Sequence, residues 1–157
     1  MNPTVGTRLL LVDDDRLVLT TLARELTGLG YVVEPAASAE EALRRCETGS
    51  FDLALVDIRL PGVSGLDFAK VLTDRCNLPY LFLSALSDPE TVREARGRGA
   101  QGYLVKPLTG AQIVPAIETG LARAREERTL RDREKHLSVA LSANRETSIA
   151  VGIVMAR

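Results

Sequence analysis

The sequence is poor in cysteine and has no hydrophobic run long enough to cross a membrane. Its 157 residues include two cysteines, Cys46 and Cys76, whose spacing matches neither a disulfide framework nor a metal-ligand motif. No apolar run approaches about 18 residues, and the first residues lack the basic, apolar and small-residue succession of a secretory signal. These absences predict a reduced, cytoplasmic protein without a membrane partner, in which both cysteines are ordinary helix residues.

A large excess of charge is absent as well. The formal net charge of -1 at pH 7 gives no indication of general affinity for nucleic acids or membranes. Beyond Leu121, however, eight Lys or Arg accompany five Asp or Glu, so this tail is net positive. With 45% hydrophobic residues, the chain is long enough for one domain with a substantial core and an appendage.

Short apolar runs alternate with helix-like segments along most of the chain. Strands are predicted at residues 8–12, 31–36, 53–56, 80–83 and 103–105, and helices at 16–29, after Ser38, after Ser64 and after Asp88. Asp15 is expected to cap the first helix, and Ser38 with Glu41 is typical of a capping box. A fivefold alternation of this kind requires right-handed crossovers. It therefore predicts an α/β fold with a parallel sheet and helices on both faces.

The last part of the chain is predicted to form a helix that leaves the globular body. From about Thr109 apolar residues recur at helical spacing as far as Leu141, and Pro115 is expected to kink or distort this helix. A heptad pattern is interrupted by the charged residues 125–128, which leaves a dimeric coiled coil and a solvated single helix as open alternatives. We therefore expect a domain at residues 1–121 and a helical extension at residues 122–157.

Charged side chains follow three of the predicted strands. Asp13 and Asp14 follow the first, Asp57 follows the third and Lys106 follows the last. The carboxyl ends of parallel strands meet at one edge of a sheet, where ligands bind in open α/β folds. Two carboxylates about 4 Å apart repel each other by roughly 4 kcal/mol at an effective dielectric near 20, so the cluster requires a cation. Mg²⁺ accepts carboxylate, water and phosphate oxygens, and the pattern predicts a magnesium site that handles phosphate.

These residues stand in a longer pattern that resembles the receiver domain of two-component response regulators. The motifs are Val12-Asp13-Asp14, the run VDIRLPGVSG at residues 56–65, Leu83-Ser84-Ala85 and Tyr103-Leu104-Val105-Lys106-Pro107. The resemblance covers residues 8–121 and implies a flavodoxin-like fold with five parallel strands. It also implies a signalling protein that catalyses only its own phosphotransfer and dephosphorylation and is not otherwise an enzyme.

The resemblance implies a role for each of the charged residues. Asp57 would accept a phosphoryl group from a histidine kinase or a small acyl phosphate. Asp14 and Asp57 would bind Mg²⁺ directly, with the main-chain carbonyl of Arg59 as a further ligand and Asp13 acting mainly through water. Lys106 would neutralise the transferring oxygens together with the metal, which makes a carboxylate a competent nucleophile.

The resemblance also implies a conformational switch. The Ser84 hydroxyl would turn toward the new phosphoryl oxygens and Tyr103 would change its rotamer. A hydrogen bond to a charged group contributes about 1.5–3 kcal/mol, whereas moving a population from 1:99 to 99:1 requires roughly 5.5 kcal/mol, so the hydroxyl alone cannot complete the switch. By the same resemblance a cis peptide bond precedes Pro107, and Arg59 and Leu86 tune the phosphoryl lifetime.

A second resemblance concerns the end of the chain. Residues 137–145 and 149–157 are similar to the opening of the ANTAR RNA-binding domain of transcription antitermination regulators, of which only the first helix is present. A core that small needs all of its helices, so we expect RNA binding only where a complete ANTAR domain is present. A truncated sequence and a remnant helix used for homodimerisation remain alternatives. His136 is expected to be a solvated surface residue.

Two other functions remain open. A small phosphatase of the haloacid dehalogenase type would use Asp13-Asp14-Asp15 as its first motif, but it leaves Asp57 without a role and lacks a later acidic pair beyond Lys106. A receiver that no longer accepts phosphate could serve only as a dimerisation module, although such a domain would be free to lose one of its carboxylates.

Overall fold

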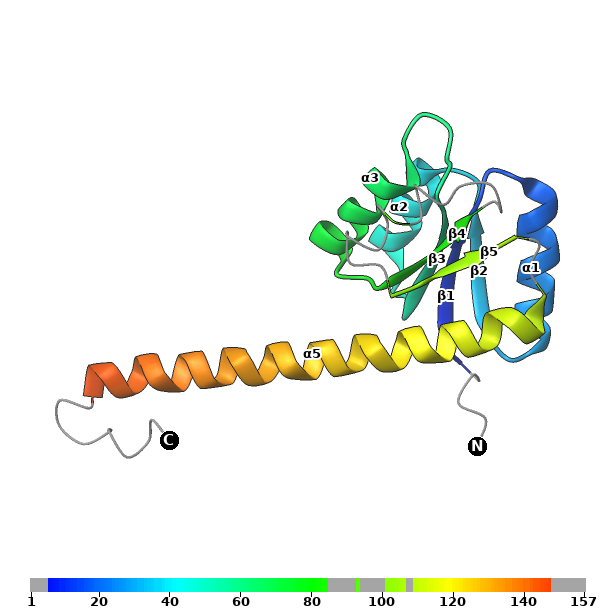
Figure 1. Cartoon of the computed structure of the whole chain (residues 1–157). Helices are drawn as coiled ribbons and strands as arrows, with labels where there is room; N and C mark the ends of the chain where they lie inside the picture. Colours follow the sequence, from blue (N-terminus) through cyan, green and yellow to red (C-terminus); the bar gives the residue numbers. More distant parts are fainter. Residues whose placement is uncertain (1–5, 85–92, 94–100, 107–108, 148–157) are drawn as a thin grey trace. The chain divides into compact units, whose positions relative to one another are not determined.

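Five parallel strands form one sheet in the computed structural model, which describes residues 6–84, 93, 101–106 and 109–147, with side chains as far as residue 136 (Figure 1). The strands are β1 (Arg8–Val12), β2 (Val32–Ala36), β3 (Leu53–Asp57), β4 (Tyr80–Ser84) and β5 (Tyr103–Val105). Their order in the sheet is β2-β1-β3-β4-β5, and every neighbouring pair is parallel. The predicted flavodoxin-like fold is confirmed.

The strands end one residue later than predicted at two important positions. Asp57 and Ser84, which were expected to follow their strands, are themselves the last residues of β3 and β4. The backbone pairing continues past them, because the Ile58 N–H donates to the Leu83 carbonyl at 2.9 Å and the Lys106 N–H donates to the Ser84 carbonyl at 2.8 Å. The backbone that carries these side chains is therefore held by the sheet.

Helices cover both faces of the sheet. α1 (Arg16–Gly28) and the beginning of α5 (Gly110–Thr147) pack on one face. α2 (Ala39–Thr48) and α3 (Gly65–Val71) pack on the other, and α3 continues into a widened π-type turn, η1 (Leu72–Cys76). The helix predicted after Asp88 lies outside the described residues.

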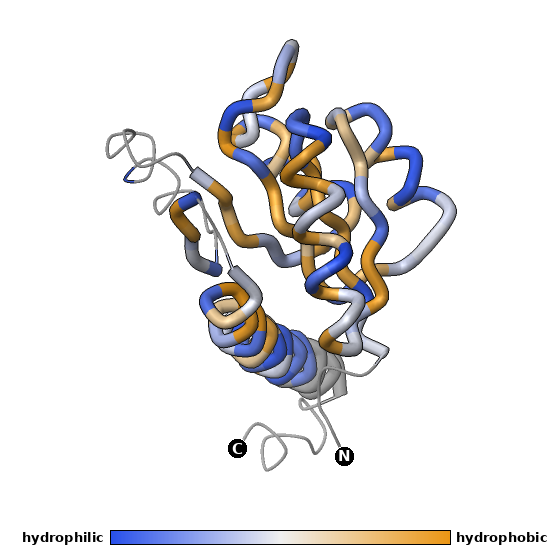
Figure 2. Tube along the Cα trace, turned by 90° about the vertical axis from the view of Figure 1, so that its right-hand side faces the viewer, coloured by the Kyte–Doolittle hydropathy of each residue, from blue (hydrophilic) through white to orange (hydrophobic). Residues whose placement is uncertain are grey.

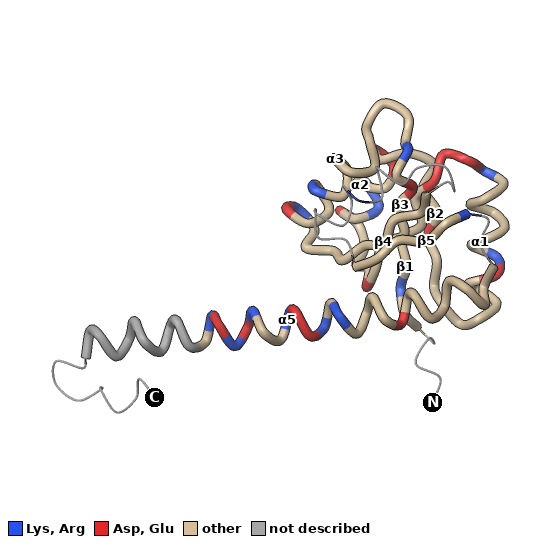
Figure 3. Tube along the Cα trace, in the orientation of Figure 1, with Lys and Arg blue, Asp and Glu red and all other residues tan. Residues whose placement is uncertain are grey.

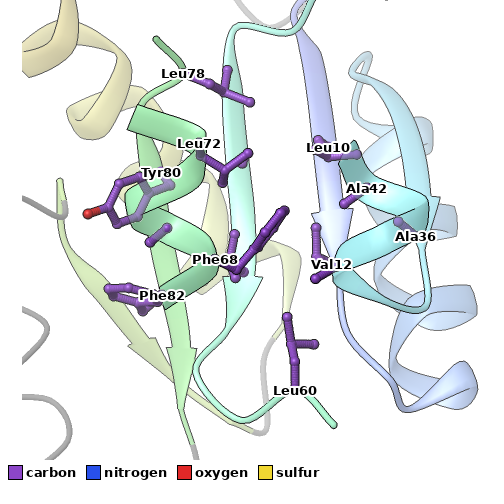
Figure 4. Packing of buried hydrophobic residues seen from close by; sticks show 14 of the residues in the cluster. Leu10, Val12, Ala36, Ala42, Leu60, Phe68, Leu72, Leu78, Tyr80 and Phe82 are labelled. Atoms are coloured by element: carbon purple, nitrogen blue, oxygen red, sulfur yellow. The ribbon is translucent and has the colours of Figure 1, made fainter. Parts of the chain in front are cut away.

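Alternate strand residues belong to two separate hydrophobic clusters. In β1, Leu10 and Val12 face α2 and α3, whereas Leu9 and Leu11 face α1 and α5. Phe68 of α3 packs at the centre of the first cluster (Figure 4), and hydrophobic segments follow the strands through the interior (Figure 2). Burial of a side chain of this size stabilises the fold by about 1.5–3 kcal/mol. Because both faces of the strands are buried, the residues that follow the strands are held in defined positions.

Side-chain caps begin three of the helices as the sequence predicts. Asp15 accepts hydrogen bonds from the Leu17 and Val18 amides, and Ser38 and Ser64 each accept one from the amide three residues later. The predicted capping box differs in one contact, because the Glu41 carboxylate accepts from the Ala37 amide at 3.1 Å. Each cap contributes about 1 kcal/mol to its helix.

The predicted distortion at Pro115 does not interrupt α5, which remains helical through this residue. The ring nitrogen of Pro115 has no hydrogen to donate to the preceding turn. Ile113 and Ile117 are fully buried on either side of it, and their packing stabilises the helix there.

The chain divides into two units, Met1–Ala122 and Arg123–Arg157. In the second unit residues 125–136 are exposed, and charges of both signs alternate along the helix (Figure 3). No helix among the described residues combines the length and the apolar character that a bilayer crossing needs. The coiled coil and the partial ANTAR helix stay predictions.

Candidate functional site

The structure brings the predicted charged residues together at the carboxyl edge of the sheet. Asp13 and Asp14 follow β1, Asp57 ends β3 and Lys106 follows β5. Asp13 is fully buried, Asp57 is 7% exposed and Asp14 is exposed. They surround a cavity of about 340 Å³ lined by Asp13, Asp14, Asp15, Asp57, Ile58, Arg59, Ser84 and Lys106.

Lys106 lies between two of the carboxylates. Its Nζ forms an ion pair with Asp13 Oδ2 at 2.6 Å and donates a hydrogen bond to Asp57 Oδ2 at 3.2 Å. Burial alone would lower the pKa of Lys106, but the charges and hydrogen bonds of Asp13 and Asp57 outweigh burial and raise this pKa above its usual value. Lys106 is therefore a fixed ammonium at neutral pH.

Asp57 is held in a defined orientation by two donors. Its Oδ1 accepts the Arg59 N–H at 3.0 Å, and its Oδ2 accepts from Lys106. Burial is the largest effect on Asp57 and raises its pKa to about 6. The hydrogen bond from the Arg59 amide lowers this pKa, the charge of Asp13 raises it, and Lys106 lowers it. At neutral pH the carboxylate is ionised, yet it is more basic than an ordinary aspartate, which suits a nucleophile.

The acidic residues are arranged as ligands for a hard cation. Asp13, Asp14 and Asp57 each present a carboxylate oxygen, and these oxygens lie within 4.8 Å of one another. The Asp15 N–H donates to Asp13 Oδ1 at 2.9 Å, and the buried Asp13 Oδ2 faces the Lys106 ammonium. Lys106 compensates one of the three negative charges, so a divalent cation would neutralise the cluster.

Ser84 lines the same cavity, whereas Tyr103 does not. The Ser84 hydroxyl is buried and has no hydrogen-bond partner in the described structure, so it is available for a new acceptor. Tyr103 is partly buried at the start of β5 and packs against the hydrophobic cluster beneath α2 and α3. Its role as a switch stays a prediction, and Leu86 and Pro107 lie outside the described residues.

Gly65, the last residue of the motif at residues 56–65, permits the close approach of α3 to the end of β3. A Cβ on Gly65 would lie 2.3 Å from the Asp57 carbonyl oxygen and 2.6 Å from the Ile58 Cα. The Gly65 N–H instead donates to the Ile58 carbonyl at 2.7 Å. Only glycine permits this contact, which brings the first residue of α3 against the backbone at the end of β3. The one sequence signal is a glycine directly after the capping Ser64.

Comparison with known proteins places these features in a family. Residues 9–118 match the family model described as "Response regulator receiver domain". The chain belongs to this receiver domain family. Its functional groups all lie at the carboxyl edge of the sheet, where open α/β folds bind ligands. They are the acidic cluster, the buried hydroxyl of Ser84 and the ammonium of Lys106.

Relatives extend the similarity beyond the receiver domain. The transcriptional regulatory protein PdtaR of Mycobacterium tuberculosis is 32% identical over 98% of this chain and 75% of its own length. The uncharacterised transcriptional regulatory protein YcbL of Bacillus subtilis is 32% identical over 73% of this chain, which spans about half (51%) of that protein. A CheY-like receiver domain of Methanospirillum hungatei has a TM-score of 0.70 and 31% identity over 78% of this chain and 98% of its own.

Proposed function

We propose that this chain is a phosphorylation-controlled response regulator in which Asp57 accepts a phosphoryl group from a histidine kinase. The observation that carries the proposal is the convergence of three carboxylates, one ammonium and one buried hydroxyl on a single cavity. The ends of four strands, or the residues that follow them, thus provide a nucleophile, a cationic stabiliser and a hydrogen-bond donor for the product.

The residues of the cavity fit a magnesium ion. All available ligands are oxygens, they are close enough to share one cation, and they carry an uncompensated negative charge. Asp14 and Asp57 would hold the ion directly, with the Arg59 carbonyl as a further ligand and Asp13 acting through water. When bound, Mg²⁺ neutralises phosphoryl oxygens and orients them for in-line transfer.

The side chains of the site then have separate tasks in phosphotransfer. A carboxylate oxygen of Asp57 attacks phosphorus while the bond from phosphorus to the histidine nitrogen of the donor breaks. Asp13 holds the Lys106 ammonium over the site, where it stabilises negative charge on the transferring group. The chain catalyses this transfer to itself and the later hydrolysis, and it has no other substrate.

Ser84 is proposed to convert the new phosphoryl group into a structural signal. Because its hydroxyl has no hydrogen-bond partner among the described residues, a hydrogen bond to a phosphoryl oxygen should add about 1.5–3 kcal/mol. That gain is smaller than the roughly 5.5 kcal/mol needed for a complete population shift. Lys106, the backbone amide after Ser84 and the interface with the partner are proposed to supply the remainder.

The output is proposed to pass through the C-terminal helix, residues 122–157, to transcription. Similarity to PdtaR covers 98% of the chain and therefore includes this segment, and the name of that relative describes a transcriptional regulator. Transcription antitermination by RNA binding is the proposed output of a form with a complete ANTAR domain, with homodimerisation through the helix as the other route.

Incubation with acetyl phosphate and Mg²⁺ tests the proposal. Intact-mass analysis should show one added phosphoryl group that maps to Asp57, and chelation of the metal should abolish it. Asp57→Asn should remain unmodified, whereas the matched control Asp74→Asn, an exposed acidic position in η1, should behave as the wild type. Repeated turnover of an added phosphoester without a stable adduct would indicate the phosphatase instead, and no reaction at all would indicate a dimerisation module.

A further inference from the structure

The two cysteines meet at the end of the sheet opposite the acidic cavity. Cys46 lies in the last turn of α2, and Cys76 ends η1, shortly before β4 begins. Both are half-buried and pack against the same hydrophobic cluster, part of which Figure 4 shows. Both side chains line one cavity, and the neighbouring Cys76 is one of the groups that raise the pKa of Cys46. The prediction that they are helix residues is confirmed, but they form a pair that their spacing did not indicate.

A cavity gives small molecules access to this pair. It has a volume of about 360 Å³, and its lining includes Cys46, Cys76, Glu47, Phe51 and Arg75. Glu47 and Arg75 are exposed, so the cavity communicates with solvent. A water molecule occupies about 30 Å³ in the liquid, so the cavity beside the two cysteines has room for a molecule the size of hydrogen peroxide.

We propose that Cys46 and Cys76 form a redox-modification site that hydrogen peroxide converts to an intramolecular disulfide. One cysteine loses its proton and attacks a peroxide oxygen as the thiolate. The O–O bond breaks, the departing hydroxide takes up that proton, and a sulfenic acid and water result. The second sulfur then attacks the sulfenic sulfur, an S–S bond forms, and the hydroxyl group leaves as water with the remaining thiol proton. The two thiols lose two electrons in total, and the peroxide gains them.

The surroundings assign an order to these steps. Burial, together with the neighbouring Cys76, raises the pKa of Cys46 to about 12, so Cys46 stays protonated at neutral pH and reacts second. Cys76, next to Arg75 on the cavity wall, makes the first attack. Within the part of the chain that the structure describes, no third metal-binding side chain joins the two thiols, which favours a disulfide over a metal centre.

The proposed bond is separate from the phosphoacceptor. It would connect the end of α2, which precedes β3, to η1, which precedes β4. Asp57 lies at the other end of β3. A strand of five residues spans roughly 16 Å. Oxidation should therefore leave phosphorylation of Asp57 intact, and a failure of either proposal would not decide the other.

Titration of the folded full chain with hydrogen peroxide tests the site. The wild type should lose both free thiols together, and its intact mass should fall by the mass of two hydrogen atoms. A proteolytic digest should contain a peptide pair linked through Cys46 and Cys76, and dithiothreitol should reverse the change. The thermal midpoint of the oxidised chain should rise by about 5 °C or more, because the bond closes a long loop. In Cys46→Ser the reaction should stop at a sulfenic acid on Cys76 that dimedone traps.

Three results would overturn the proposal. They are oxidation of the wild type to intermolecular dimers or to separate sulfinic acids, resistance of both thiols in the folded chain, and a lower thermal midpoint after oxidation. The mapping of the wild-type disulfide requires no variant, so the test stands even if Cys46→Ser folds poorly.

Discussion

Lys106 Nζ lies 2.6 Å from Asp13 Oδ2, so the lysine that follows β5 reaches across β4 and β3 to the carboxylate that follows β1. Asp13 is fully enclosed, while 24% of the Lys106 side chain is exposed. An enclosed carboxylate requires a positive partner. The same contact that positions the ammonium for phosphotransfer therefore also compensates a buried charge.

Replacement of Lys106 should destabilise the metal-free protein and strengthen its binding of Mg²⁺. In Lys106→Met, Asp13 and Asp57 lose their cation, and we expect a loss of about 2–3 kcal/mol in the free energy of unfolding. Added Mg²⁺ should restore most of this loss, since the metal then supplies the missing charge. Urea unfolding with chelator and with Mg²⁺ measures both effects. Lys70→Met removes an exposed lysine of α3 and should change little; equal losses in the two variants would contradict this explanation.

The stability of the metal-free chain should fall as the pH rises from about 4 to above 6. Burial raises the pKa of Asp57 to about 6 from a usual value of 3.8, so the folded state holds this proton more tightly than the unfolded state. Its contribution is complete below pH 4 and is lost as the pH passes 6, with a total of about 3 kcal/mol.

This pH dependence can be isolated by comparison with Asp57→Asn, which has no proton to lose. The difference in the free energy of unfolding between the variant and the wild type, measured in chelator at pH 4.5 and pH 7.5, should grow in favour of the variant at the higher pH. A constant difference would show that Asp57 titrates at its usual value.

Gly65→Ala should be strongly destabilising although both residues are small. The new methyl group would lie 2.3 Å from the backbone oxygen of Asp57, and backbone atoms cannot move aside without displacing β3 or α3. We expect a loss of at least 2 kcal/mol together with slower phosphorylation. Gly28→Ala is the control, since nothing lies within 4 Å of its Cβ position, and alanine at this end of α1 should be neutral or stabilising by up to about 1 kcal/mol. Similar chemical denaturation curves for both variants would refute this.

Tyr31→Phe should loosen the packing of α5 against the sheet. The enclosed Tyr31 hydroxyl donates to Glu118 Oε1 at 2.9 Å, and burial together with Glu118 raises the pKa of this tyrosine. Loss of the bond should cost about 1–2 kcal/mol and speed amide hydrogen exchange near Ile117. Glu118→Gln keeps an acceptor and should lose less. Unchanged exchange in Tyr31→Phe would assign the stability of this helix to its apolar contacts alone.

Several features of the site follow from local sequence patterns. Asp13, Asp57 and Lys106 could be assigned to one edge because each ends a short apolar run, and parallel strands align their carboxyl ends. Asp15 could be assigned as a cap because a short carboxylate before a helix accepts amide hydrogens. Two contacts had no such pattern. The approach of Gly65 to Asp57 and the meeting of Cys46 with Cys76 both depend on how α2 and α3 pack on the sheet.

The order of residue types along the chain was sufficient for the α/β architecture, for the family resemblance and for the set of charged residues at strand ends, because apolar period and turn chemistry act over a few neighbouring residues. The tertiary structure decided which of those charges touch, which hydroxyl is buried in the acidic cavity and which two cysteines line the cavity at the other end of the sheet. These are distances between segments remote in sequence, and they depend on strand order and on side-chain packing.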